Sequence, residues 1–180
     1  MAKQYPEIGP VLQRFVEAQH IFFVATAPPD ARINLSPKGM DTFRVLGPNR
    51  VAWLQVTGSG NETSAHLAAD GRITIMFCAF EGHPNILRLY GRGRAVHRQD
   101  EGWQDLIGHF DELPGTRQVI DCDIDLVQTS CGMSIPYFDH VGERDNLVRW
   151  AEAKGHDGLA DYWAQKNTAS IDGLPAVLPT

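Results

Sequence analysis

The hydrophobic positions near the start of the chain repeat with the period of a helix. Ile8, Val11, Leu12, Phe15 and Val16 fall on one helical face, and this spacing predicts an amphipathic helix. The pattern then changes to short apolar runs that are separated by turn signals, which is typical of strands. These runs cover residues 20–26, 32–36, 42–46, 50–56, 72–79, 87–96 and 119–129.

Helical patterns interrupt and follow the strand runs. One covers residues 65–70 after a polar loop, one covers 101–110, and the tail holds two short ones at 147–153 and 159–165. Six or seven strands joined mostly by short turns favour an antiparallel β-barrel over a βαβ array. We therefore predict one mostly β domain over residues 1–180, with a barrel at about 8–130 and a helical C-terminal extension at about 131–180.

Two features within the strand runs carry predictions of their own. Gly91 and Gly93 lie in an alternating strand, which indicates a β-bulge or a close approach of another backbone. The alternating aspartates at 121–125 resemble the start of a calcium loop but lack its glycine at the sixth position. We interpret them as a solvated strand face.

Composition and charge exclude several classes of protein. The 180 residues are 43% hydrophobic and 21% charged, as in an ordinary globular protein. No apolar run approaches the roughly 20 residues of a membrane span, and the N-terminal sequence lacks a secretory signal, so we expect a cytoplasmic protein. A net charge of −6 argues against a nucleic-acid binder.

Most catalytic and metal-binding motifs are absent from the sequence. The three cysteines form no C-x-x-C pair and the seven histidines are scattered, so we expect reduced thiols and no metal site. There is no P-loop, no G-x-G-x-x-G and no G-x-S-x-G. Cys131 has no recognisable base, and we predict no catalytic side chain.

The segment that points to chemistry is the polar loop between a strand and a helix at residues 57–64. Its hydroxyl groups, its glycines at positions 58 and 60, and a helix that begins at about 61–63 together form a typical phosphate site. The alternative is an ordinary helix start with Asn61 or Thr63 as the N-cap. The candidate phosphate residues of this loop are Thr57, Gly58, Ser59, Asn61, Thr63 and Ser64.

Two residues outside this loop complete the candidate site. Lys38 could supply the cation that a phosphate needs in an acidic protein, although it could equally be a solvated turn lysine. Trp53, in the strand before the loop, either contacts a cofactor or packs in the barrel wall. Arg88, Arg92 and Arg94 alternate on one strand, and form either a solvated face or an anion-facing patch.

The ordered set of these segments resembles the pyridoxamine 5′-phosphate oxidase-related, FMN-binding split-barrel family. The segments that carry the resemblance are FFVATA (22–27), INLSPKG (33–39), VAWLQVTGSGNETSAHL (51–67), ITIMF (73–77) and LYGRGRAV (89–96). The later segment TSCGMSIPYF (129–138), followed by a helical tail, resembles one subgroup of that family. The match covers roughly residues 8–130.

The resemblance implies a homodimer with FMN at the subunit interface, acting as an oxidoreductase on a small molecule. Lys38, Thr57, Thr63 and Ser64 match positions that contact the FMN phosphate in the family. Asn34 and Ser36 would then be candidates for hydrogen bonds to the edge of the flavin ring. The Met133–Tyr137 segment of the second subunit would cover that ring.

The chain departs from the oxidase at three places. Ile33 stands where the oxidase has an arginine, Glu62-Thr63 stand where it has Arg-Lys, and Ser170–Pro175 lacks its substrate-binding arginine and histidine. These departures argue against the oxidase's own reaction. The alternatives are a flavin-binding or sensing protein without turnover, or a deazaflavin or haem in the same barrel, with His66, His83 or His140 as conceivable haem ligands.

Overall fold

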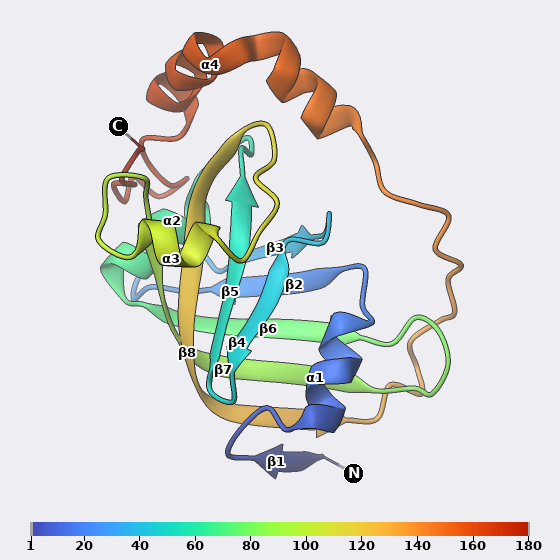
Figure 1. Cartoon of the computed structure of the whole chain (residues 1–180). Coiled ribbons are helices and arrows are strands. Elements are labelled where there is room, and N and C mark those ends of the chain that lie inside the picture. Colours follow the sequence, from blue (N-terminus) through green and yellow to red (C-terminus); the bar gives the residue numbers. More distant parts are fainter. Residues whose placement is uncertain (1, 180) are drawn as a thin grey trace.

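A computed structural model describes residues 2–179, and its chief element is one antiparallel eight-stranded sheet (Figure 1). The strands follow the order β3-β2-β6-β7-β8-β5-β4, and β1 pairs with β8 beside this path. They are β1 (Lys3–Tyr5), β2 (Phe22–Thr26), β3 (Asn34–Lys38), β4 (Phe43–Gly47), β5 (Arg50–Val56), β6 (Arg72–Cys78), β7 (Ile86–Val96) and β8 (Thr116–Ser130). The helices are α1 (Pro10–Glu17), α2 (Glu62–Ala69), α3 (Trp103–Ile107) and α4 (Asn146–Lys166).

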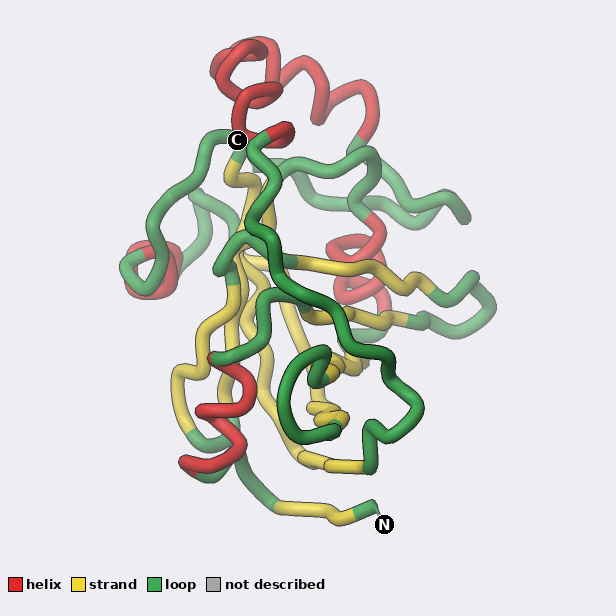
Figure 2. The backbone as a smooth tube through the Cα atoms, turned by 90° about the vertical axis from the view of Figure 1, so that its right-hand side faces the viewer, coloured by secondary structure: helices red, strands yellow, loops and turns green. Residues whose placement is uncertain are grey.

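The sheet curls on itself, as the side view in Figure 2 shows, and it encloses an apolar core. The long strands β7 and β8 pair along most of their lengths, and β8 also pairs with β5. Val24, Trp53, Ile75, Leu89 and Ile120 are fully buried in the main core. The two ends of the strand path, β3 and β4, do not pair with each other, so the barrel is split there.

The predicted split-barrel class is confirmed, and most predicted strands lie within two or three residues of the observed ones. The bulge prediction is also confirmed, because the β7–β8 register shifts between Tyr90 and Gly91. A Cβ on Gly91 would lie 2.0 Å from the carbonyl oxygen of Asp123, so this approach of two backbones requires glycine. The three-residue strand β1 was missed because its largely exposed residues carry no periodic hydrophobic pattern.

Of two further predictions, one needs correction and the other is confirmed. The aspartates at 121–125 are not all solvated, because Asp121 is buried and forms ion pairs with Arg50 and Arg94 from the neighbouring strands. The two helical patterns predicted for the tail are confirmed, because α4 consists of two helical parts on either side of a break at Gly155, whose φ is +64°.

The C-terminal extension begins with a linker at residues 131–145 that forms no helix or strand. It runs along the outside of the molecule from the end of β8 to the start of α4 (Figure 1). α4 then crosses the far end of the molecule and brings the residues after it next to the loop that follows β5. Among the described residues, no helix is both long enough and apolar enough to span a membrane.

Candidate functional site

A cleft of about 760 Å³ opens where the barrel is split. One wall is β3, and the opposite wall is the end of β5 with the loop at residues 57–61 and the first residues of α2. Arg117 of β8 lies among its lining residues, and Leu147 and Ile171 of the C-terminal extension contribute to its rim.

Seven of the ten predicted site residues line this cleft. They are Asn34, Ser36, Lys38, Thr57, Gly58, Ser59 and Thr63. The structure therefore brings together the end of β3 and the polar loop, although 18 positions separate Lys38 from Thr57 in the sequence. The fold accounts for this arrangement, because β3 and β5 lie on the two sides of the split.

The other three predicted residues do not line the cleft. Trp53 is fully buried and packs against Phe22 in the main core, which was the alternative interpretation of its place in the strand. Asn61 is fully buried and accepts a hydrogen bond from Gln118 at 3.2 Å, and its side chain does not cap α2. Ser64 is buried in the first turn of that helix.

Two cations share the cleft. Lys38 donates to Ser36 Oγ at 2.8 Å, and burial, together with the charge of Arg117, lowers the pKa of Lys38 to about 8. Arg117 is almost completely buried, and this burial lowers its pKa to about 10. Because like charges are costly to bury together, this pair favours an anion between or beside them.

Arg117 still has hydrogen-bonding capacity. Its Nη1 donates to Gly60 O at 3.1 Å and to Asn167 Oδ1, but its buried Nε has no partner among the described residues. A buried N–H without a partner costs free energy unless a ligand satisfies it. An anionic ligand in the cleft fits the charge of this guanidinium, although the buried Nε itself is not accessible from the cleft.

The polar loop is held in place by the C-terminal extension. Thr57 Oγ1 donates to Gly115 O at 2.8 Å and accepts a hydrogen bond from Trp163 Nε1 at 2.8 Å. Asn167 Nδ2 donates to Gly58 O at 3.3 Å. The loop therefore keeps one shape and leads directly into α2, whose first-turn N–H groups have no partners within the helix.

A hydrogen-bonded network connects β3 to α2 behind the cleft. Asn34 Nδ2 donates to both Thr63 Oγ1 and Thr26 Oγ1, each at 3.3 Å. Thr26 Oγ1 is in turn 3.0 Å from the buried His66 Nδ1. The network fixes the position of Thr63 relative to the wall that carries Lys38, and it leaves His66 enclosed rather than open to the cleft.

Three residues that shape the site were not predicted from the sequence: Arg117, Trp163 and Asn167. The last predicted strand began at Val119, two positions after Arg117, so this arginine was not considered on a strand. An arginine next to a run of buried residues is the signal that could have identified it. Trp163 and Asn167 act through tertiary contacts and leave no local pattern.

Comparison with known proteins agrees with this architecture. A family model described as pyridoxamine 5′-phosphate oxidase matches residues 8–131. A protein of Aspergillus flavus, described as pyridoxamine 5′-phosphate oxidase family protein ustO, is 37% identical over 191 residues that cover 96% of this chain and 77% of the relative.

Two solved structures share the fold at low sequence identity. A variant of HupZ from Group A Streptococcus is 16% identical with a TM-score of 0.55, and the match covers 68% of this chain and 99% of that one. The FAD binding protein from Mycobacterium smegmatis is 13% identical with a TM-score of 0.50, and the match covers 69% of this chain and 96% of that one.

Proposed function

Because the chain belongs to the pyridoxamine 5′-phosphate oxidase family, we propose that its cleft binds FMN and that the protein is an FMN-dependent oxidoreductase. The observation that carries the proposal is the pair Lys38 and Arg117 beside the hydroxyl-bearing loop and the start of α2. A phosphate dianion would neutralise the charges of the half-buried Lys38 and the buried Arg117.

The residues present divide into two groups for this ligand. Lys38, Arg117, Ser59 and Thr63 would hold the phosphate through charge and hydroxyl groups. Thr57 would keep the loop in place, because its one hydroxyl hydrogen is already donated to Gly115 O. Asn34 and Ser36, on β3, would hydrogen-bond the polar edge of the flavin ring. Ser64 and Asn61 lie behind this surface and would act only by keeping the loop and helix in place.

FMN supplies the redox chemistry when bound, since it accepts a hydride or electrons and passes them on. The protein then needs to bind and orient the cofactor and to limit water access, and no side-chain acid or base is required. The polar lining of the cleft would bind the cofactor, and the residues around its open side would select the substrate.

Two of the positions at which the chain differs from the oxidase, Glu62 and Ile33, line the cleft. Glu62 lines the cleft, and its Oε1 accepts a hydrogen bond from the backbone N–H of Ile171 at 2.9 Å. The side chain of Ile33, which also lines the cleft, is 75% exposed. At these places hydroxyl and backbone N–H groups would replace the charges of the oxidase around the FMN phosphate. Because Ser170–Pro175 also lacks the substrate-binding arginine and histidine, we propose a substrate other than pyridoxamine phosphate.

We also propose a homodimer that completes the flavin site. The linker carries apolar side chains that are mostly exposed: Met133 (82%), Tyr137 (77%), Phe138 (59%) and Val141 (98%). Leu35, on the edge strand β3 beside the cleft, is 66% exposed. Apolar surface of this kind on an edge strand and a linker favours coverage by a second copy of the chain.

The proposal is tested by titrating the flavin-free protein with FMN and with riboflavin, following flavin fluorescence. We expect one FMN per chain and binding of riboflavin at least ten-fold weaker, because riboflavin lacks the phosphate. Thr63→Ala should weaken FMN binding, whereas Thr74→Ala, a matched change on β6, should not. Equal affinities for FMN and riboflavin, or no flavin binding, would refute the site.

A separate measurement tests turnover. The FMN-loaded protein should lose its flavin absorbance when NAD(P)H is added without air and should regain it on aeration. Anaerobic reduction with a panel of small molecules then identifies the substrate class. If FMN is bound but no donor reduces it, the protein is a flavin carrier or sensor.

A further inference from the structure

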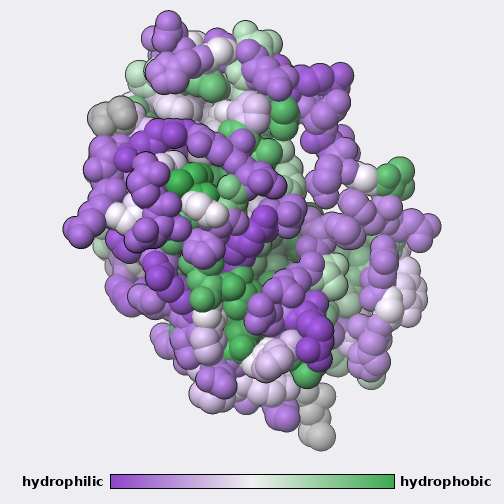
Figure 3. All heavy atoms as spheres, in the orientation of Figure 1, coloured by the Kyte–Doolittle hydropathy of each residue, from purple (hydrophilic) through white to green (hydrophobic). Residues whose placement is uncertain are grey.

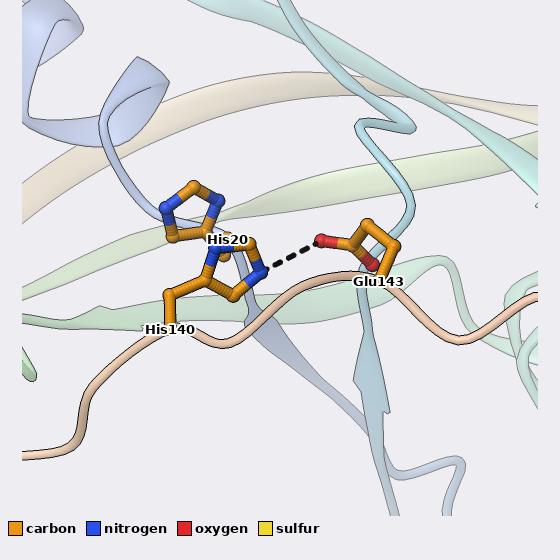
Figure 4. Close-up of side chains that lie close together, drawn as sticks. All are labelled: His20, His140 and Glu143. Atoms are coloured by element: carbon orange, nitrogen blue, oxygen red, sulfur yellow. Dashed lines mark ion pairs between the residues drawn. The ribbon is translucent and has the colours of Figure 1, made fainter.

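We propose that His20, His140 and Glu143 form a binding site for one divalent transition-metal ion, with zinc as the reference ion. His20 lies between α1 and β2, whereas His140 and Glu143 lie in the linker at residues 131–145. One ligand atom from each residue lies within 4.8 Å of the other two. Figure 4 shows the two imidazole rings over one another with the carboxylate beside them.

The chemistry of these three groups suits such an ion. Imidazole nitrogens and a carboxylate oxygen are common ligands of zinc and of other first-row metals, and three protein ligands leave at least one coordination position open. The imidazole Nε2 of His140 lies 3.4 Å from Glu143 Oε1, so two ligands already adjoin each other. An ion would bind all three groups at about 2 Å.

The rings are now stacked, with centroids 3.6 Å apart and planes inclined by 11°. Stacked rings direct their nitrogen lone pairs in parallel, so they must turn until the nitrogens converge on the ion. All three residues are exposed, and such side chains change rotamer readily. The backbone positions that bring the ligands together need not move.

The Glu143 carboxylate also contacts a residue outside the three proposed metal ligands. Glu143 Oε2 accepts a hydrogen bond from the backbone N–H of Met40 at 3.3 Å. Met40 adopts a positive φ of +64° in the turn after β3, and this turn aims its N–H at the carboxylate. A second contact of this kind orients a metal-binding carboxylate and raises affinity in known sites.

The surrounding charge also favours a cation. The backbone N–H of His140 is 3.4 Å from Glu81 Oε1, and Asp139 precedes it in the chain. Arg144 is the one basic residue next to Glu143 in the sequence. Glu81, Asp139 and Glu143 line one cleft together with Arg144 and Lys38, so three carboxylates outnumber two cations there.

An ion at this position would join the linker to the body of the protein, across 120 sequence positions between His20 and His140. Both histidines line a second cleft of about 1120 Å³, which shares Lys38 and the turn at residues 37–40 with the flavin cleft. Figure 3 shows the linker standing apart from the body on this side. The ion would hold this wall of the second cleft in place.

The site does not depend on the proposed flavin, and its test uses the flavin-free protein without a histidine tag. Isothermal titration with Zn²⁺ should show one ion per chain, and Co²⁺ should give a visible ligand-field spectrum. His140→Ala and Glu143→Gln should each weaken Zn²⁺ binding at least ten-fold. His156→Ala, which removes a histidine that is 97% exposed on α4, should leave binding unchanged.

Two results would overturn the proposal. One is the absence of one-to-one Zn²⁺ binding by the wild-type protein. The other is equal Zn²⁺ affinity in wild type, His140→Ala and Glu143→Gln, which would place any bound ion elsewhere. Titration of the same samples with FMN shows separately whether the variants are folded and whether the flavin site is present.

Discussion

Replacement of Lys38 by methionine should raise the free energy of unfolding of the flavin-free protein and lower its affinity for FMN. Burial and the charge of Arg117 lower the pKa of Lys38 from its ordinary value of 10.5 to about 8. At 1.36 kcal/mol for each pKa unit, this shift corresponds to about 3 kcal/mol of unfavourable free energy in the charged, ligand-free state. Methionine has a similar length and no charge, so it removes this cost.

The dependence on pH has a definite sign. Between pH 8 and 10.5 the unfolded chain holds a proton on Lys38 that the folded, flavin-free protein has released. The free energy of unfolding therefore rises with pH in this interval, and the cost is fully present below pH 8. In Lys38→Met this rise should be absent, and the variant should melt several degrees higher than wild type at pH 7.

Affinity for FMN should change in the opposite direction. A charge-assisted hydrogen bond to phosphate contributes roughly 1.5–3 kcal/mol, so Lys38→Met should raise the Kd about 10- to 150-fold at pH 7. In the wild type the Kd should also rise as pH passes about 8, because the phosphate binds the protonated amine. Lys38→Met should lack this dependence.

The assay combines urea unfolding of the flavin-free protein with fluorescence titration of FMN, each from pH 7 to 9.5. Riboflavin serves as the ligand control, since its binding should not respond to Lys38. Lys3→Met, on the distant strand β1, serves as the protein control. A variant that loses stability at pH 7 would refute the burial cost assigned to the charged Lys38. A variant that binds FMN as well as wild type does would show that Lys38 does not face the phosphate.

Three further outcomes follow from particular contacts. Asn167→Ala should destabilise the protein by about 1–3 kcal/mol in urea unfolding and weaken FMN binding, because it leaves a buried arginine short of a partner; unchanged stability would contradict this. Gly91→Ala should cost about 3 kcal/mol or more, since its Cβ would meet the Asp123 carbonyl, whereas Gly47→Ala, which meets nothing within 4 Å, should cost less than about 1 kcal/mol. Burial raises the pKa of Asp121, but its two arginine partners hold this pKa below the usual range. Asp121→Asn should therefore be less stable than wild type at neutral pH, and the difference should shrink as acid protonates the carboxylate. A constant difference from pH 7 to 3 would contradict this prediction.

Local pattern was sufficient to predict seven of the eight strands and the polar loop of the candidate site. β5 was predicted with its observed bounds, and the start of α2 falls where the predicted helix start lies, because turn residues and hydrophobic periodicity are local properties. The polar loop and Lys38 were identified from chemistry alone, and the split of the barrel brings them to one cleft.

Tertiary arrangement decided the rest. Trp53 lies on the same strand as residues that line the cleft, but its side chain points into the core. The alternation along the strand does not show which of its two faces is buried, because that depends on the folded sheet. Arg117 and Asn167 come together from β8 and the segment after α4, 50 positions apart, and no spacing rule connects them. His20 and His140 are likewise separated by most of the chain.

The attachment of the end of α4 and the residue after it to the polar loop has a consequence for the biogenesis of the protein. Trp163 and Asn167 bond to Thr57 and Gly58, so the loop cannot reach its final shape until the ribosome has made residues more than 100 positions further on. A growing polypeptide that ends before Trp163 contains all the barrel strands but lacks the hydrogen bonds that fix the conformation of this loop. Cofactor loading is therefore expected to be a late event, after most of the chain has left the ribosome.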